Sequence, residues 1–351
     1  MSRAVAALPL ALLVSACSPS APTPSSPPSP VYEYYAYGKL WDAATLAAGP
    51  VLFNTGLVPE EADPGFYGSL SAVSFSPDGQ RVATGGSDVA GVWDVGTGQR
   101  VSRLADIKFR LRPVQAVRFR ADGLLVVADA GTVWQPAPAG RPGPGFPHRC
   151  RLVAVSPDGS LAAGDHLNPS PGGPRAGPDL DVTPVYNVAT GAEVARMDTP
   201  TNRHVSFSPD GSKLVTVSYG PAGPFTVRVW DARTGKGLAA RPGSDPLAWT
   251  PDGKRLAIYG ADKSVVEVWD PAADTVAGFR HGQVLLTALA FSPDGTRLAL
   301  AGPQLRVWDF TVQREVAAAR AGPVLIEGMA FSPDGRTLVT VGESREEVSQ
   351  K

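Results

Sequence analysis

Short apolar stretches alternate with turn-forming residues along almost the whole chain after residue 30. In each stretch, apolar and polar residues take turns over several positions before Ser-Pro-Asp-Gly or a close variant follows. Alternation with a period of two residues is typical of a half-buried β-strand. In the turn, proline sets φ at the first position and glycine supplies the left-handed φ that closes it. The pattern therefore predicts a series of β-hairpins.

The strand-and-turn phrase recurs seven times. The copies lie at residues 73–79, 117–123, 153–159, 205–211, 247–253, 289–295 and 329–335. Their turn aspartates follow one another at steps of 36 to 52 residues. A period of this size indicates a repeat architecture in which each repeat is one supersecondary unit.

A second phrase, apolar residues followed by Trp-Asp or a variant, comes after each of the first six turns. It lies at residues 91–94, 132–135, 184–187, 227–231, 266–270 and 305–309. Several copies continue through another turn into a fourth apolar stretch. Four strands in about forty residues, with Trp-Asp at the end of the third, resemble the WD40 repeat. The resemblance implies an all-β fold over residues 31–342, a seven-bladed β-propeller of four-stranded antiparallel blades.

The two ends of this region carry complementary parts of one unit. Residues 38–45 form a third-strand phrase with no turn phrase before it, and residues 46–53 supply a fourth strand. The last hairpin, residues 329–342, has no Trp-Asp after it. We therefore expect the N-terminal strands to complete the C-terminal blade, which closes the ring and leaves no free sheet edge there. Residues 343–351 are expected to be a charged tail.

Two units depart from the pattern. In the second, residues 136–149 contain so much proline and glycine that a regular fourth strand has little room. The third has an insertion at residues 165–181, and Tyr186-Asn187 replaces Trp-Asp. The resemblance also implies an Asp, His, Ser/Thr and Trp network within a blade. Only His281 matches its histidine, so we expect the network to be incomplete in every unit.

The N-terminal segment has the composition of an export signal. Arg3 precedes an apolar run of eleven residues, 4–14, which is shorter than the roughly 20 that a spanning helix needs. The following Val-Ser-Ala-Cys resembles the lipobox of bacterial lipoproteins, which implies cleavage after residue 16 and lipid on Cys17. An ordinary signal peptide is the alternative. Residues 18–30, with six prolines and five serines, read as an extended tether, so that 1–16 is the signal peptide and 17–30 the lipidated linker.

Composition narrows the possible partners. Thirty-two Lys and Arg residues balance 33 Asp and Glu residues, for a formal net charge of −1. This balance gives no general field for nucleic acid. The two cysteines exclude a disulfide framework. If Cys17 carries lipid, Cys150 remains as a single thiol, and we expect it to be buried.

Catalytic motifs are absent from the sequence. It has no G-x-S-x-G elbow, no H-E-x-x-H and no phosphate loop, and its four histidines are scattered over separate units. The turns account for most of the recurring aspartates. We therefore expect no enzymatic activity, no cofactor and no metal. The alternative is an envelope hydrolase or lyase with its site at the mouth of the channel.

The candidate partner-binding residues lie between units and in the third-unit insertion. Basic and apolar residues alternate at 106–113, and acidic residues follow in 165–181, so that together they predict an uneven charged docking surface. An exposed edge strand and a solvated loop are the alternative interpretations. The residues are Lys108, Phe109, Arg110, Arg112, Arg149, Asp165, Asp179 and Asp181.

These observations predict a lipid-anchored, exported and monomeric propeller that serves as a protein-protein interaction scaffold in the bacterial cell envelope. The sequence does not identify the envelope proteins that it would bind.

Overall fold

The structure is a computed structural model in which every described regular element is a β-strand. It describes residues 31–55, 70–86, 91–103, 114, 116–123, 125–128, 133–134, 150–166, 182–199, 202–219, 225–282, 285–320 and 324–348. Within these ranges, no helix has the length and apolar character of a membrane span.

The strands form antiparallel sheets that follow the order of the repeats. Sheet 1 contains β3 (Leu70–Phe75), β4 (Arg81–Gly86), β5 (Gly91–Asp94) and β6 (Arg100–Arg103). Sheet 2 contains β7 (Ala116–Phe119), β8 (Leu125–Ala128) and β9 (Val133–Trp134). Sheet 3 contains β10 (Cys150–Val155), β11 (Leu161–His166), β12 (Val182–Asn187) and β13 (Glu193–Asp198).

The second half of the chain continues this arrangement. Sheet 4 contains β14 (Asn202–Phe207), β15 (Lys213–Tyr219), β16 (Phe225–Asp231) and β17 (Gly237–Pro242). Sheet 5 contains β18 (Ser244–Trp249), β19 (Leu256–Tyr259), β20 (Val265–Asp270) and β21 (Thr275–Arg280). Sheet 6 contains β22 (Ala288–Phe291), β23 (Arg297–Ala301), β24 (Leu305–Asp309) and β25 (Arg314–Ala319).

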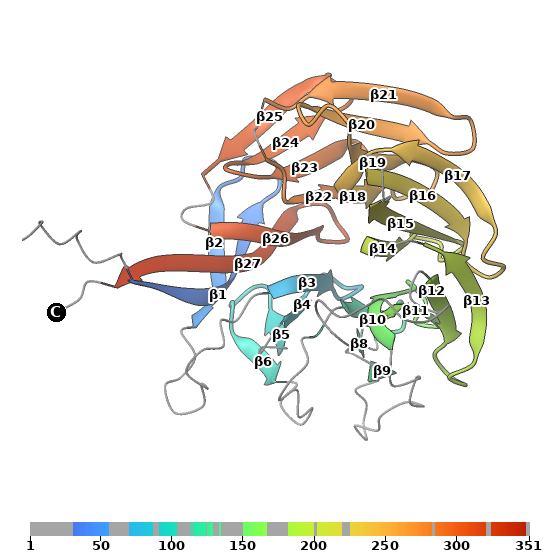
Figure 1. Ribbon diagram of the computed structural model, residues 1–351. Coiled ribbons are helices and arrows are strands. Elements are labelled where there is room, and N and C mark those ends of the chain that lie inside the picture. The colour runs from blue at the N-terminus through green and yellow to red at the C-terminus, as the bar shows by residue number, and fades with distance from the viewer. Residues whose placement is uncertain are drawn as a thin grey trace, which may run out of the picture.

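Strands from the two ends of the chain form one further sheet, the seam sheet. Its order is β2 (Ala48–Thr55), β1 (Val31–Asp42), β27 (Thr337–Val348) and β26 (Val324–Phe331). In Figure 1, β1 lies directly beside β27. Their pairing runs from Val31 opposite Val348 to Asp42 opposite Thr337. β27 therefore extends beyond residue 342, the predicted end of the propeller, because residues 343–348 pair with residues 31–36.

The architecture is a β-propeller of antiparallel blades. The first strands of the sheets lie toward the middle of the molecule, and fourth strands such as β13, β17 and β21 lie on its outside (Figure 1). β3, β7, β10 and β14 contact one another in turn, as do β18, β22 and β26, while β16 contacts β18 and β26 contacts β3.

The prediction of seven four-stranded blades is confirmed only in part, because the described residues contain six such blades. Six of the described sheets have four strands, whereas sheet 2 has three described strands. Residues 135–149, where the sequence left a fourth strand of this sheet uncertain, lie outside the described residues.

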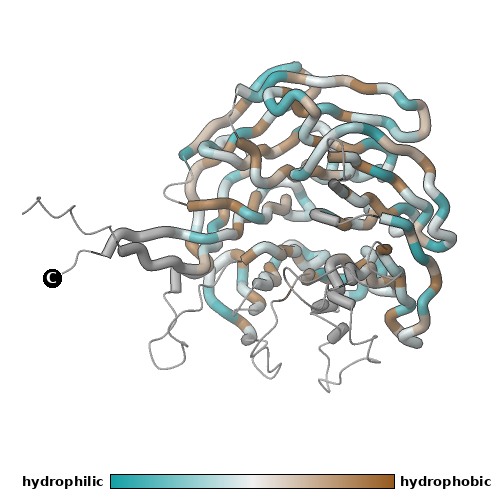
Figure 2. Tube along the Cα trace, in the orientation of Figure 1, coloured by the Kyte–Doolittle hydropathy of each residue, from teal (hydrophilic) through white to brown (hydrophobic). Residues whose placement is uncertain are grey.

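Burial follows each strand's place in its sheet. All four residues of β19 are buried, since both faces of a second strand are covered by neighbouring sheets, whereas β21 is almost wholly exposed. Figure 2 shows apolar residues along the strands and hydrophilic residues at many of the turns. Side chains of adjacent sheets share one core: Val215 and Val227 pack with Leu247, Ile258 and Trp269. Each such aliphatic side chain contributes about 1.5–3 kcal/mol by burial.

The seam sheet packs on both of its neighbours. On one side, Leu40 of β1 and Val339 of β27 share a core cluster with Leu70 of sheet 1. On the other side, Ile326 of β26 packs with Val307 of sheet 6. The seam sheet is therefore held by side-chain packing as well as by its backbone pairing.

The repeated Ser-Pro-Asp-Gly turns share one hydrogen-bonded geometry. At a representative turn, Ser208 Oγ donates to Asp210 Oδ1 at 2.5 Å, and the amide of Ser212 donates to the same oxygen at 3.0 Å. Gly211 has a φ of +71°, which confirms the left-handed position predicted from the sequence. The same Ser/Thr-to-Asp bond closes the turns at Asp78, Asp158, Asp252, Asp294 and Asp334.

The tryptophans of the third strands contribute to the core, as Trp41, Trp93 and Trp269 do. Trp93 Nε1 donates to Thr84 Oγ1 of the second strand at 3.0 Å. Equivalent bonds join Trp41 to Thr340 and Trp230 to Thr216, both at 2.9 Å. These pairs are the part of the expected network that the described sheets contain. Sheets 5 and 6 have Ile258 and Leu300 in place of the threonine.

Candidate functional site

The described surface contains a cavity at the junction of sheets 5 and 6. It begins at Phe279, which is partly buried at the end of the otherwise exposed strand β21. Phe279 pairs in register with Val266, which is fully buried. Its ring stacks on Trp308 of β24, with centroids 4.2 Å apart and planes 15° apart. This aromatic pair joins the outer strand of one sheet to the third strand of the next.

We call the cavity the 5/6 cleft. Its volume is about 150 Å³. That volume corresponds to roughly five waters, less than the 300–1,000 Å³ of a typical site for a whole small molecule. It suits a single side chain. The cleft is lined by Phe279, Arg280, His281, Gly282, Leu300, Arg306, Trp308 and Glu315.

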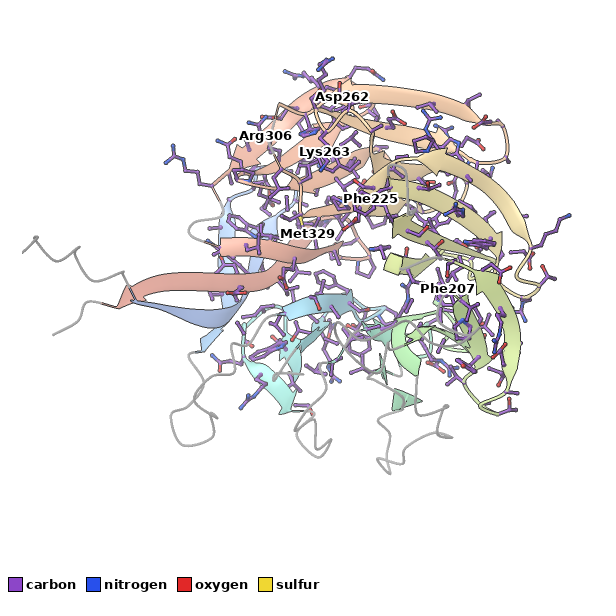
Figure 3. The ribbon with its side chains drawn as sticks, viewed as in Figure 1. Phe207, Phe225, Asp262, Lys263, Arg306 and Met329 are labelled. Carbon is purple, nitrogen blue, oxygen red and sulfur yellow. The ribbon has the colours of Figure 1, made fainter. Side chains whose placement is uncertain are left out.

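Arg306 is a charged group of the cleft whose guanidinium forms several hydrogen bonds. Its side chain is 25% exposed, and Nη1 lies 3.1 Å from Glu315 Oε2 of the neighbouring strand β25. The same nitrogen donates to the carbonyl oxygen of His281 at 3.1 Å, and Nη2 donates to Gln304 Oε1 at 2.8 Å. These bonds fix the guanidinium in place on the cleft wall. Figure 3 labels Arg306 together with Asp262 and Lys263 of the turn between β19 and β20.

Arg280 is held more loosely. Its Nη1 donates to Ser264 Oγ at 2.6 Å, and Nη2 lies 3.6 Å from Asp262 Oδ2. The two charged side chains are 74% and 58% exposed. Ion pairs this exposed are worth little because water and salt screen them. Arg280 can therefore reorient toward a bound group at small cost.

His281 is neutral at neutral pH. Burial lowers the pKa of its imidazole, and the nearby Arg306 guanidinium lowers it further. A hydrogen bond with the backbone of Lys263 and the charge of Asp262 raise the pKa, but less. The side chain is 5% exposed, and its ring lies against Tyr259 with centroids 5.7 Å apart.

The lining of the cleft combines cationic, acidic and aromatic side chains. Its lining residues include two arginines, one glutamate and two stacked aromatic rings, and none of them is Ser, Thr or Cys. Among the described residues, no three His, Cys, Asp or Glu side chains lie close enough to hold a metal ion. The arrangement can recognise a small anionic group by charge-assisted hydrogen bonds.

Most of the site residues predicted from the sequence lie outside the described part of the chain. These are Cys17, Lys108, Phe109, Arg110, Arg112, Arg149, Asp179 and Asp181. Asp165 lies in β11, where it pairs in register with Arg151 of β10. The docking surface that these residues were predicted to form therefore stays a prediction.

Sequence reasoning missed the residues of the 5/6 cleft. It singled out His281 only as a member of the family network, and Trp308 only as part of a Trp-Asp phrase. The available signal was the pair of arginines beside them, since Arg280 precedes His281 and Arg306 lies two residues before Trp308. Sequence alone did not indicate that the end of β21 would lie against β24.

Comparison with known proteins agrees with the repeat pattern. The WD40 family model, described as WD domain, G-beta repeat, matches residues 64–94. This range includes β3, β4 and β5 of sheet 1. No curated protein matches the chain. The chain is thus a β-propeller of antiparallel blades in which residues 64–94 match the WD40 repeat.

Proposed function

We propose that this protein is a lipid-tethered, non-catalytic propeller that acts as a protein-interaction scaffold in the bacterial cell envelope. The observation that carries the proposal is that the repeated aspartates and tryptophans form turns and core packing. The turn aspartates accept hydrogen bonds from their own turns, and the third-strand tryptophans pack between sheets. WD40 propellers typically bind other proteins, which favours the same function.

The propeller is proposed to be a closed ring of seven blades, with sheet 2 as the irregular one. Six four-stranded sheets and the three described strands of sheet 2 support this number. The packing of the seam sheet on sheets 1 and 6 supports closure. Closure would leave the outer strands as the only sheet edges, which is how propellers limit unwanted strand pairing.

The membrane tether is proposed from residues 1–30. Cleavage after residue 16, lipid on Cys17 and the extended linker up to residue 30 would hold the propeller at a membrane surface. Acyl chains gain about 0.8 kcal/mol per buried methylene, so several chains anchor a protein without a spanning helix. We expect the tethered protein to be a monomer, and the surface around Lys108, Arg149 and Asp181 to contribute to partner binding.

Crosslinking in native membranes tests the scaffold function. Photo-activated crosslinking of the full chain is expected to give discrete adducts that contain an envelope protein. The exposed Leu285 is a suitable attachment position, and the exposed Val276 on the outer strand β21 is a matched second position. A defined turnover activity that disappears in Asp165→Ala or Asp181→Ala would contradict the proposal and favour the hydrolase or lyase.

A further inference from the structure

The junction between sheets 4 and 5 can be compared with the 5/6 cleft position by position. Arg241 of β17 pairs in register with Val227, three residues before Trp230. It reaches across to Glu267 of β20, two residues before Trp269, with Nε and Oε2 2.8 Å apart. Both side chains are mostly buried, at 27% and 20% exposed. A cation from one sheet and an acid from the next therefore complete this junction.

The equivalent positions at the junction of sheets 5 and 6 carry different residues. Phe279 pairs with Val266, three residues before Trp269, and so stands where Arg241 stands. Arg306, two residues before Trp308, stands where Glu267 stands. The acid is thus replaced by a cation and the cation by an aromatic ring. The cavity of about 150 Å³ lies at this substituted junction.

The described lining of the 5/6 cleft contains two cationic side chains and one carboxylate. Arg280 and Arg306 line it, and Glu315 is the one carboxylate among its described lining residues. Glu315 already receives a hydrogen bond from Arg306. The second cation, Arg280, forms an ion pair with the solvent-exposed Asp262, the one ionic partner that it has among the described residues. A carboxylate brought from outside could bind both guanidiniums, since arginine presents paired donors that match a carboxylate.

The floor of the cleft suits the carbon atoms of an acidic side chain. Phe279 and Trp308 stack face to face there, and the fully packed Leu300 lies beside them. Leu285, three residues beyond Gly282, is 53% exposed and offers apolar surface close by in the chain. Such a site fits the methylene groups of a glutamate and an apolar residue next to it.

We propose that the 5/6 cleft binds a glutamate or aspartate side chain of a partner protein, presented in a short segment beside an apolar residue. This inference rests on the proposed scaffold function, because it specifies the chemistry of one contact that the scaffold makes. Arg306 and Arg280 bind the carboxylate, and the stacked rings hold its methylene groups. The neutral His281 adds no further charge.

Selection of peptides on the full-length protein tests the inference. The probe is a library of short random peptides displayed on phage, followed by labelled copies of the selected peptides in a polarisation assay. The selected sequences are expected to carry Glu or Asp beside an apolar residue. Replacing that acid by Gln or Asn is expected to weaken binding about tenfold or more.

Variants of the protein locate the contact. Arg306→Gln and Arg280→Gln are each expected to weaken binding about tenfold, since each removes one charge-assisted partner. Arg280 is 74% exposed, so its replacement leaves the fold intact. Arg241→Gln at the junction of sheets 4 and 5 is the matched control and is expected to bind like the wild type.

Two outcomes would overturn the inference. Selected peptides that lack an acid, or none selected at all, would show that the cleft does not recognise a carboxylate. Acidic peptides that bind both cleft variants as tightly as the wild type would place the contact elsewhere. In the second case the proposed scaffold function would still stand. That function is tested separately, and the absence of crosslinked envelope proteins would contradict it.

Discussion

At the scale of single residues, the turns between third and fourth strands differ in how much backbone strain they hold. In three of these turns a glycine takes the left-handed conformation, for example Gly235 with a φ of +71°. In three others the same place is taken by Leu46, Asp274 or Gln313, with φ between 50° and 54°. A side chain in this conformation costs roughly 1–2 kcal/mol, and each of the three must be compensated by its contacts.

Replacing Gln313 by glycine is therefore expected to stabilise the protein by up to about 1 kcal/mol, because glycine relieves the strain but gains entropy when unfolded. The exposed Gln313 loses only a hydrogen bond to the carbonyl of Phe310 at 3.2 Å. Urea unfolding measures the change. Leu46→Gly is the control: Leu46 is 4% exposed, so that variant is expected to be less stable. A destabilised Gln313→Gly would contradict the strain argument.

At the scale of elements, the hairpin turns couple stability to pH. Burial alone would raise the pKa of Asp210, but hydrogen bonds from Ser208 and Ser212 lower it to about 2. The pKa of Asp78, Asp158, Asp252 and Asp294 is lowered in the same way by a Ser or Thr of the turn. Because the folded protein holds these groups ionised more strongly than the unfolded chain, it binds fewer protons in acid.

We therefore expect the contribution of these aspartates to the free energy of unfolding to be constant above about pH 4. It is expected to fall as the pH drops toward about 2. Denaturant titrations over this range measure it. Asp210→Asn, which cannot ionise, is expected to be less stable near neutral pH and to lose less stability in acid than the wild type. A wild-type stability that stays level down to about pH 2 would show that the turn carboxylates are not selectively stabilised.

The elements also show what sequence reasoning can reach. Ser-Pro-Asp-Gly and Trp-Asp act locally, through turn hydrogen bonds and one strand's packing, so their spacing was enough to predict the hairpins. The extension of β27 to Val348 was missed because Glu343, Glu346 and Glu347 look like a solvated tail. They form a strand because they pair with Val31–Ala36, far away in the sequence, and Glu343 also pairs with Leu325 of β26.

At the scale of the whole molecule, function depends on positions that no local pattern contains. The 5/6 cleft exists because Phe279 of one repeat meets Arg306 of the next, and each residue alone fits an ordinary strand. Conversely, most of the residues predicted as a docking surface from their charge lie outside the described residues. The repeat forms the scaffold, and its junctions differ from one another: Phe279 and Arg306 stand at the junction of sheets 5 and 6 where Arg241 and Glu267 form an ion pair at the junction of sheets 4 and 5.

The central proposal is a propeller held at a membrane by lipid. The most direct test measures the intact mass of the protein from native membranes and its incorporation of labelled fatty acid. Both are measured for the wild type and for Cys17→Ala. The wild type is expected to begin at Cys17 and to carry acyl chains. The variant is expected to keep residues 1–16 and to take up no label. A wild-type protein that keeps residues 1–16 and takes up no fatty acid would contradict the tether.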